Sequence, residues 1–411
     1  HRTYIFQTSA APAVDAQSGT FYIDPTNGVD DSAVNGSEST PWKTVTYALT
    51  RVVGTSAQPS IINLKAGTYT ADSGETFPVL LENHVSFFGQ GSQTTLIDGQ
   101  NTVTQLFKGQ SVVGVTLSEL ALANTVGNMS NGDKGGALYL DGNSSVVLHQ
   151  VQLFNHRDHL YGGAIYAVDT SLTLIQNRIF DNTAQGGGGI YLKGGGILAQ
   201  GNHFTYNQTI NVADDRDGGA ILILGTDAGN PTNGSLEDNY FVGNSSVNDG
   251  GAIALWNAAI HLFHNRMEAN HADKRGGAIF VKSNNSVAPQ LRLNDIYANT
   301  ADIDGNAVFN SNGNVSFSAP DNYWGGNPQF ADLVANITYD PIVSDPFFAD
   351  NLQIVALSDT KGVIVPSEKG YQLGGVLSDQ IDSPLLMVEA KVVGSPQGLE
   401  AVSLWLNEVW Q

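Results

Sequence analysis

The stretch GGAIALWNAAIHLFHNRMEANHADKRGGAIFV, from Gly250 to Val281, holds one complete copy of the pattern that decides the fold. It opens on Gly-Gly and a short apolar run, passes through an Asn-x-apolar-x-x-Asn unit, and returns to Gly-Gly at Gly276. Paired glycine allows sharp turns and close backbone approach, and asparagine tolerates left-handed backbone and bonds to neighbouring backbone groups. These features are typical of one coil in a stacked repeat.

Both units recur along the chain, and the starts of successive glycine units are 25 to 32 residues apart. The glycine units are GGALYL from Gly135, GGAIYA from Gly162, GGGIYL from Gly187, GGAILI from Gly218, GGAIAL from Gly250, GGAIFV from Gly276 and a degraded GNAVF from Gly305. The asparagine units are NRIFDN from Asn177, NHFTYN from Asn202, NYFVGN from Asn239, NRMEAN from Asn265 and NDIYAN from Asn294. Short alternating strands without helical periodicity predict a β-solenoid, in which each coil buries its inner face by stacking on the next. Asparagines at one corner of successive coils are expected to form a hydrogen-bonded ladder.

Four segments are expected. Residues 1–19 are a polar lead-in, 20–110 an N-terminal cap with the first coils, 111–348 the repeats, and 349–411 a β-rich segment without Asn corners. In the cap, a short helix beginning near Pro41, with Thr40 as N-cap, is expected to cover the open end of the first coil. The last segment is either a final sheet layer or the start of a sandwich domain, and the sequence favours the sandwich.

Composition narrows the partners. The net charge of −21 repels phosphate backbones, so nucleic acid is not expected as a partner. There is no cysteine, so any metal must be bound by carboxylate, carbonyl or imidazole groups. No apolar run is long enough to be a transmembrane segment, and the opening at His1 without an initiator Met predicts a mature chain whose leader has been removed.

Several motifs resemble known secreted proteins. The GGA[ILV] unit with its apolar-x-x-Asn partner, as in Phe204 to Asn207 and Phe241 to Asn244, resembles the repeats of the chlamydial polymorphic outer membrane proteins. STPWKTVTYAL, LKAGTYT and TTLIDG are similar to the N-terminal module of many secreted bacterial β-helix proteins, and NYWGG from Asn322 to a segment that often closes them. The resemblance, over about residues 20–345, implies an all-β, right-handed parallel β-helix. It further implies export, often with display as an adhesin or autotransporter passenger, although related coils also carry polysaccharide lyases and epimerases.

Two polar insertions mark the coil of Gly218 as the first place to look for function. QTINVADDRD precedes its Gly-Gly strand and TDAGNPTNGS follows it. Insertions in repeats protrude as loops and tend to gather on a functional face.

The turn before each Gly-Gly strand is the best candidate site, because residues at equal offsets in successive coils stack on one face. Three interpretations stay open for its charged residues. They form a solvated edge, or Asp215, Asp217 and Asp249 bind Ca²⁺, or a metal neutralises a uronate while a basic residue removes the adjacent proton. The candidates for that base are Arg216, Lys274 and Arg275.

Aromatic side chains near the insertions are expected to stack on sugars. The predicted binding residues are Asp214, Tyr206, Tyr240 and Trp256. The first functional hypothesis is therefore a secreted or cell-surface β-helix protein that acts in adhesion, binding or surface structure and contacts a glycan or a cell-surface protein. The alternative is a calcium-assisted polysaccharide lyase or related carbohydrate-active enzyme.

Overall fold

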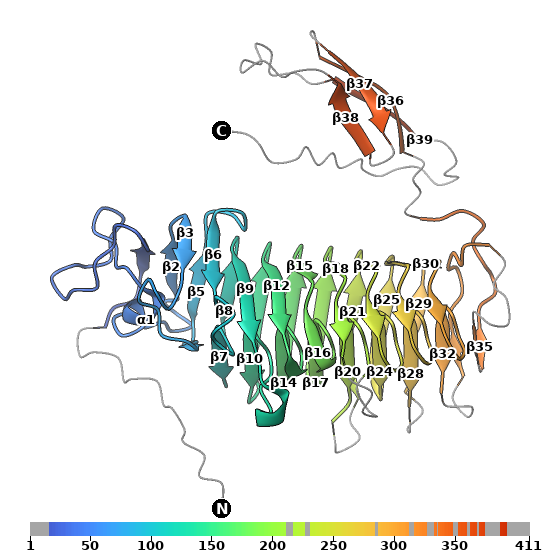
Figure 1. Cartoon of the computed structure of the whole chain (residues 1–411), viewed down its shortest axis with the longest axis horizontal. Coiled ribbons are helices and arrows are strands. Elements are labelled where there is room, and N and C mark those ends of the chain that lie inside the picture. The colour runs from blue at the N-terminus through green and yellow to red at the C-terminus, as the bar shows by residue number, and fades with distance from the viewer. Residues whose placement is uncertain are drawn as a thin grey trace, which may run out of the picture. The chain divides into compact units, whose positions relative to one another are not determined.

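The computed structural model describes residues 16–210, 217–226, 231–283, 287–311, 316–326, 333–334 and 336–347, together with the backbone of four strands between 352 and 392. The chain divides into two compact units, His1–Ser344 and Asp345–Gln411. The first unit is a right-handed parallel β-helix, in which the strands of successive coils lie side by side from the blue N-terminal end to the orange end (Figure 1).

Each full coil has up to four strand segments, and three parallel sheets run along the solenoid. The largest sheet contains the Gly-Gly strands, which follow the glycine units: β10 (Leu138–Asp141), β14 (Ile165–Ile175), β17 (Ile190–Gln200), β20 (Ile221–Leu224), β24 (Ile253–Trp256), β28 (Ile279–Lys282) and β32 (Val308–Asn310). The same sheet contains β1 (Thr20–Ile23), β2 (Ser60–Leu64), β4 (Val79–Leu80), β5 (Val85–Phe88), β7 (Phe107–Gln110), β8 (Val115–Ser118), β11 (Ser145–His149), β21 (Thr232–Glu237), β25 (Ala258–Phe263), β29 (Gln290–Arg292) and β34 (Leu333–Val334).

The strands of the other two sheets flank the Asn corners and lead back to the next Gly-Gly unit. The nine-stranded sheet consists of β3 (Gly67–Tyr69), β6 (Thr95–Asp98), β9 (Ala121–Val126), β12 (Gln152–Arg157), β15 (Arg178–Phe180), β18 (His203–Thr205), β22 (Tyr240–Val242), β26 (Arg266–Glu268) and β30 (Asp295–Tyr297). The six-stranded sheet consists of β13 (His159–Tyr161), β16 (Thr183–Gly186), β19 (Gln208–Thr209), β23 (Ser245–Ser246), β27 (His271–Ala272) and β31 (Thr300–Ala301).

The interior of the solenoid is filled by identical or similar apolar side chains in register. Ile165, Ile190 and Ile221 pair directly across β14, β17 and β20 and are fully buried. Phe204 and Phe241 stack with ring centroids 4.7 Å apart. Because strand side chains alternate, every second residue of the same strands points outward, and these outward residues form the site described below.

The predicted asparagine ladder is confirmed, and it is double. Each Asn side-chain amide donates to the Oδ1 of the Asn one coil on, at 2.9–3.0 Å, and also to a backbone carbonyl of the coil before. The two ladders are Asn177, Asn202, Asn239, Asn265, Asn294 and Asn322, and Asn182, Asn207, Asn244, Asn270 and Asn299. All of these side chains are buried.

The two glycines of each pair serve different purposes. Gly250 has φ +71°, which an L-residue rarely adopts. A Cβ on Gly251 would lie 2.1 Å from the carbonyl oxygen of Gly277 in the next coil, so the second glycine permits close stacking.

The helix of the cap begins later than predicted. It is α1 (Val45–Ala48), and its N-cap is Thr44, whose hydroxyl accepts from the Tyr47 N–H, not Thr40. Trp42 packs into the core in extended backbone before the helix, and the buried carboxylate of Glu75 accepts the first free N–H groups, those of Val45 and Thr46. Helix α1 lies at the N-terminal end of the solenoid (Figure 1).

Three short elements complete the first unit: the 3₁₀ turn η1 (Met129–Asn131), β33 (Phe317–Ser318) and β35 (Ile337–Thr338). The second unit has its own antiparallel sheet in the order β38-β37-β36-β39, with bounds Gly370–Gly374, Gly362–Ser367, Leu352–Asp359 and Met387–Val392. Its four strands pair with one another in a sheet of their own. The rest of the segment expected to form a sandwich lies outside the described residues.

Candidate functional site

Three columns of outward side chains run along the Gly-Gly strands. The first column stands directly before Gly-Gly, where the backbone carbonyls of Asp217, Asp249 and Arg275 accept from the first glycine of the preceding coil at 2.9–3.0 Å. Equal offsets therefore do stack, as the sequence predicts. The first column reads Lys134, Tyr161, Gly186, Asp217, Asp249, Arg275 and Asp304.

The second and third columns lie four and six residues after the first glycine. The second reads Tyr139, Tyr166, Tyr191, Leu222, Ala254, Phe280 and Phe309, and its middle members form an outer hydrophobic cluster separate from the interior core. The third reads Asp141, Val168, Lys193, Leu224, Trp256 and Lys282. In the coils of Asp217 and Asp249 the second column has the smaller side chains of Leu222 and Ala254 in place of tyrosine rings. A pocket lies at these coils.

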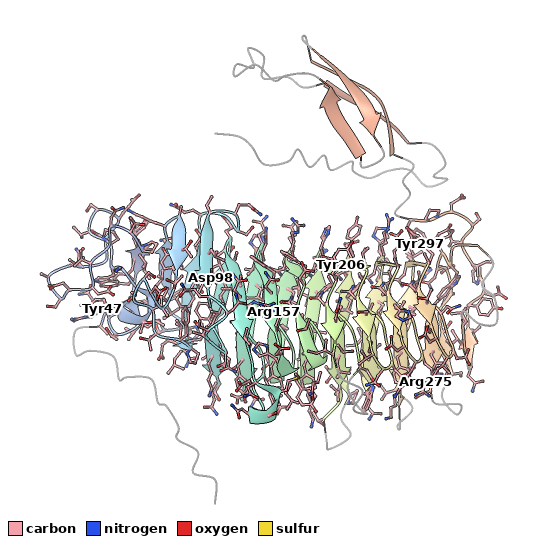
Figure 2. All side chains as sticks on the ribbon, viewed as in Figure 1. Tyr47, Asp98, Arg157, Tyr206, Arg275 and Tyr297 are labelled. Carbon is pink, nitrogen blue, oxygen red and sulfur yellow. The ribbon has the colours of Figure 1, made fainter. Side chains whose placement is uncertain are left out.

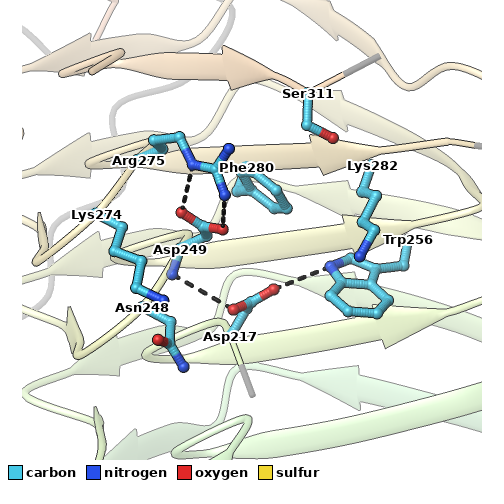
Figure 3. Close-up of a pocket in the computed structure, with 9 residues that line it drawn as sticks. All are labelled: Asp217, Asn248, Asp249, Trp256, Lys274, Arg275, Phe280, Lys282 and Ser311. Atoms are coloured by element: carbon cyan, nitrogen blue, oxygen red, sulfur yellow. Dashed lines mark hydrogen bonds and ion pairs between the residues drawn. The ribbon is translucent and has the colours of Figure 1, made fainter. Parts of the chain in front are cut away.

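The pocket has a volume of about 340 Å³ and draws side chains from all three columns (Figure 3). Its lining residues are Asp217, Asn248, Asp249, Trp256, Lys274, Arg275, Phe280, Lys282 and Ser311. They combine two carboxyl groups, three cations and two aromatic rings. Since saccharides present hydroxyl groups on an apolar ring, this mixture suits a sugar better than an apolar ligand.

Asp217 is the most deeply buried acid of the pocket, with an exposed fraction of 2 %. Its Oδ2 accepts from the Trp256 indole N–H at 3.0 Å and its Oδ1 from the Asp249 N–H at 3.4 Å. Burial, and next the nearby Asp249 carboxylate, raise the pKa of Asp217 to about 7, although these hydrogen bonds and Lys282 oppose the rise. Asp217 therefore exchanges a proton near neutral pH.

Asp249 is held by Arg275 in a two-point ion pair. The Arg275 Nε and Nη2 atoms donate to the two carboxylate oxygens of Asp249 at 3.0 and 2.8 Å. The guanidinium also lies 5.4 Å from the ring centroid of Phe280 and 5.1 Å from that of Phe309. This clamp fixes Arg275 as a structural cation, and an arginine engaged in this way is a poor base.

Trp256 is the aromatic platform of the pocket. The Lys282 Nζ lies 3.8 Å from its ring centroid, and the indole N–H is bonded to Asp217 (Figure 3). Both contacts fix the orientation of the ring before any ligand arrives, so little conformational entropy remains to be lost on binding.

The described part of the pocket does not fit a calcium ion. Calcium takes six to eight oxygen ligands. Both oxygens of Asp249 already accept from Arg275, Oδ2 of Asp217 accepts from Trp256, and Lys274 and Lys282 add positive charge. Asp215, the third predicted ligand, lies outside the described residues, as do Asp214 and Arg216.

Among the described residues, one group of side chains has the spacing of a metal site, and none of its members lines the pocket. His271, Asp273 and Asp302 place ligand atoms within 4.8 Å of one another. The His271 Nε2 lies 3.2 Å from Asp273 and 3.9 Å from Asp302, at a solvent-exposed corner. The His271 Nδ1 also lies 2.9 Å from the Thr300 hydroxyl, so contacts within the chain hold the ring at this corner.

The structure separates the three predicted sugar-stacking residues. Trp256 lines the pocket, whereas Tyr240 is in β22 of the nine-stranded sheet, stacked on His203 at 4.6 Å. Tyr206 follows β18 with 58 % of its surface exposed, and Figure 2 shows it apart from Arg275. Trp256 and the two tyrosines therefore occupy different strand segments of their coils, and stacking of sugars on each of them stays a prediction.

Sequence reasoning missed Lys282, Phe280, Asn248 and Ser311. The signal was present for the first two, since Lys282 and Trp256 stand at the same offset from their glycines and pair directly between β24 and β28. Scoring outward positions after Gly-Gly, as well as the turn before it, would have found them.

The known proteins named here resemble this chain at low sequence identity. A stretch of 174 residues is 26% identical to "Metabotropic glutamate receptor-like protein P" of Dictyostelium discoideum, covering 42% of this chain and 10% of that protein, so the chain spans about a tenth of this relative's length. Among solved structures, the pectate lyase Pel9A is 12% identical with a TM-score of 0.46, over 82% of this chain and 84% of its own. The lacto-N-biosidase of Eubacterium ramulus is 12% identical with a TM-score of 0.41, over 78% and 68%.

In the described residues, no helix is long and apolar enough to cross a membrane. A family model described as "Protein of unknown function (DUF1565)" matches residues 26–343, which include the Gly-Gly strands β10 to β32 and the whole pocket. The chain therefore belongs to the DUF1565 family.

Proposed function

We propose that this chain is an exported β-helix protein, secreted or displayed at the cell surface, that binds a saccharide in the pocket between Asp217 and Lys282. The observation that carries the proposal is the fixed platform of Trp256, which is bonded to a buried acid and flanked by a lysine. Fixed aromatic rings next to polar groups recognise the apolar face and the hydroxyls of a sugar together. Adhesion to a glycan-bearing surface follows as the biological use.

Titration calorimetry against a panel of neutral and acidic oligosaccharides tests this proposal. We expect Trp256→Ala to weaken binding of the best ligand roughly tenfold, since the stacking contact is lost, and Trp256→Phe to retain most of it. Tyr206→Ala is the matched control, because Tyr206 is an exposed aromatic outside the pocket. Equal losses for Trp256→Ala and Tyr206→Ala, or a panel without any binder, would contradict the proposal.

A second candidate function is glycoside hydrolysis, and the pKa of Asp217 near 7 favours it. In this reaction Asp217 gives its proton to the glycosidic oxygen as the bond to the anomeric carbon breaks. Water adds to that carbon, and its proton passes to Asp249 after one Arg275 hydrogen bond is released. Asp217→Asn is then expected to lower turnover at least 100-fold while binding persists.

The lyase suggested by the sequence remains a proposal of lower rank. Of its described base candidates, Arg275 is clamped to Asp249, while Lys274 lines the pocket. Appearance of an ultraviolet-absorbing unsaturated product from a polyuronate, lost in Lys274→Gln, would favour this reaction over hydrolysis.

A further inference from the structure

The lysines of the solenoid are gathered on one face. Between residues 66 and 360 the sequence has five lysines, and all five belong to the outer side of the Gly-Gly strands or to the turn before them. We call this surface the lysine face; its members are Lys108, Lys134, Lys193, Lys274 and Lys282. The chain has a net charge of −21, and the five lysines of this part lie on one strip, whereas Arg157, Arg178 and Arg266 lie on the nine-stranded sheet.

Aromatic rings accompany these lysines. The Lys108 Nζ lies 5.3 Å from the centroid of Tyr139, and the Lys134 Nζ lies 4.8 Å from that of Tyr166. Together with Lys282 over Trp256, the same pairing of a cation with an aromatic ring recurs at two neighbouring coils and at a third coil farther along the solenoid. The ring holds each ammonium at the half-buried surface, where it can meet an anion.

Acidic side chains also lie on this face: Asp133 and Asp273 directly precede Lys134 and Lys274 in the turns, and four more belong to the three columns. The four are Asp141, Asp217, Asp249 and Asp304. Asp249 is paired with Arg275, and burial, followed by the Asp249 carboxylate, raises the pKa of Asp217 to about 7, so these two carboxyls contribute less negative charge to the face than exposed ones.

Resting on the saccharide binding proposed above, we infer that the ligand is an acidic polysaccharide whose chain runs along the solenoid axis over the lysine face. The saccharide rings stack on the aromatic columns, and the carboxylates of the sugar face the lysines. Neighbouring strands lie about 4.8 Å apart, so the six steps from Lys108 in β7 to Lys282 in β28 span roughly 29 Å. That length exceeds the pocket and suits a polymer of several residues.

Binding of the polyuronate alginate, with neutral dextran as reference, tests the inference on the full chain. We expect alginate to bind, and Lys282→Gln in the pocket and Lys134→Gln five strands away to weaken binding roughly three- to fivefold each, as for the loss of one partly exposed ion contact. The matched control is Lys65→Gln, since Lys65 is also half-buried but lies at the corner after β2, where its Nζ donates to the Glu38 carbonyl at 3.0 Å. We also expect long alginate oligomers to bind more tightly than short ones.

Failure of the inference and failure of the proposed function give different results. If neutral oligosaccharides bind as well as alginate and only Trp256→Ala weakens them, the acidic ligand is wrong and the saccharide pocket stands. If alginate binds but Lys134→Gln equals the Lys65→Gln control, the axial path is overturned. If neither saccharide class binds, both proposals fail.

Discussion

Burying the carboxyl group of Asp217 lowers stability at neutral pH. The unfolded chain ionises this group above about pH 3.8, whereas the folded chain keeps it protonated until about pH 7. Over that window the unfolded state binds fewer protons, so the wild type loses about 1.4 kcal/mol per pH unit as pH rises, on the order of 4 kcal/mol in all.

The Asp217→Asn substitution is therefore expected to raise the free energy of unfolding by a few kcal/mol more at pH 8 than at pH 4. The reason is that an amide is never ionised and can still accept from the Trp256 N–H. Urea unfolding at both pH values measures the difference, and Asp302→Asn, at an exposed acid, is the control. A pH-independent effect of Asp217→Asn would show that Asp217 has an ordinary pKa. A gain in stability together with a loss of ligand turnover is the pattern expected of a functional acid.

His156 stands where the second Asn ladder would continue toward the N-terminus. The backbone N–H of His156 donates to Asn182 Oδ1. In the imidazole ring, Nε2 lies 3.0 Å from the Leu122 carbonyl oxygen and Nδ1 lies 2.8 Å from the Thr125 hydroxyl. These partners assign the proton to Nε2, so the ring reproduces the donor and acceptor of an asparagine amide. In the sequence, VQLFNH at residues 151–156 is an interrupted copy of the Asn unit that ends at His156.

Burial, and next the charge of His159, lower the pKa of His156 to about 3. Below pH 6.5 the unfolded chain takes up a proton that the folded chain refuses, so stability falls as pH falls toward 3. At pH 5 this loss is about 2 kcal/mol relative to pH 7.5. We expect His156→Asn to remove that part of the acid sensitivity in urea unfolding, whereas an unchanged slope between the two pH values would refute the assignment.

Among the elements, the Asn ladders hold the coils in register. Asn239 donates to Asn265 and to the Ala199 carbonyl, and it accepts from Asn202, all at 2.9–3.0 Å. Asn239→Ala leaves buried groups on both neighbouring coils without partners, at a cost of about 3 kcal/mol or more. Urea unfolding measures this cost, and Asn131→Ala, at an exposed asparagine, should change stability by less than about 0.5 kcal/mol.

The sequence predicts the elements well where a repeat position has one physical solution. Gly250 and the Asn corners identify turns and ladders because few other residues fit there. The helix start is different, because the choice of Thr44 over Thr40 depends on Glu75, a residue thirty positions away that no local pattern links to the helix. The pocket is likewise made by pairing between coils, so Lys282 becomes visible only once the register of β24 and β28 is known.

For the molecule as a whole, charge has two opposing effects. The net charge of −21 repels itself in the folded chain, whereas the lysine face attracts an anionic ligand. Raising ionic strength from 0.01 to 0.15 M shortens the Debye length from about 30 to about 8 Å. We expect this change to raise the temperature of the unfolding midpoint and to lower the affinity for alginate. A rise in both the midpoint and the affinity, or a fall in both, would contradict the charge distribution described above.

The central claim is that the outer side of the Gly-Gly strands is the ligand-binding surface. A crystal structure of the chain with its tightest-binding acidic oligosaccharide tests it most directly. We predict a sugar ring against Trp256, with a carboxylate within hydrogen-bond distance of Lys282 or Lys274 and the chain extending toward Tyr191. An oligosaccharide bound instead on the nine-stranded sheet beside Tyr206 and Tyr240, with the pocket of Asp217 empty, would contradict the claim.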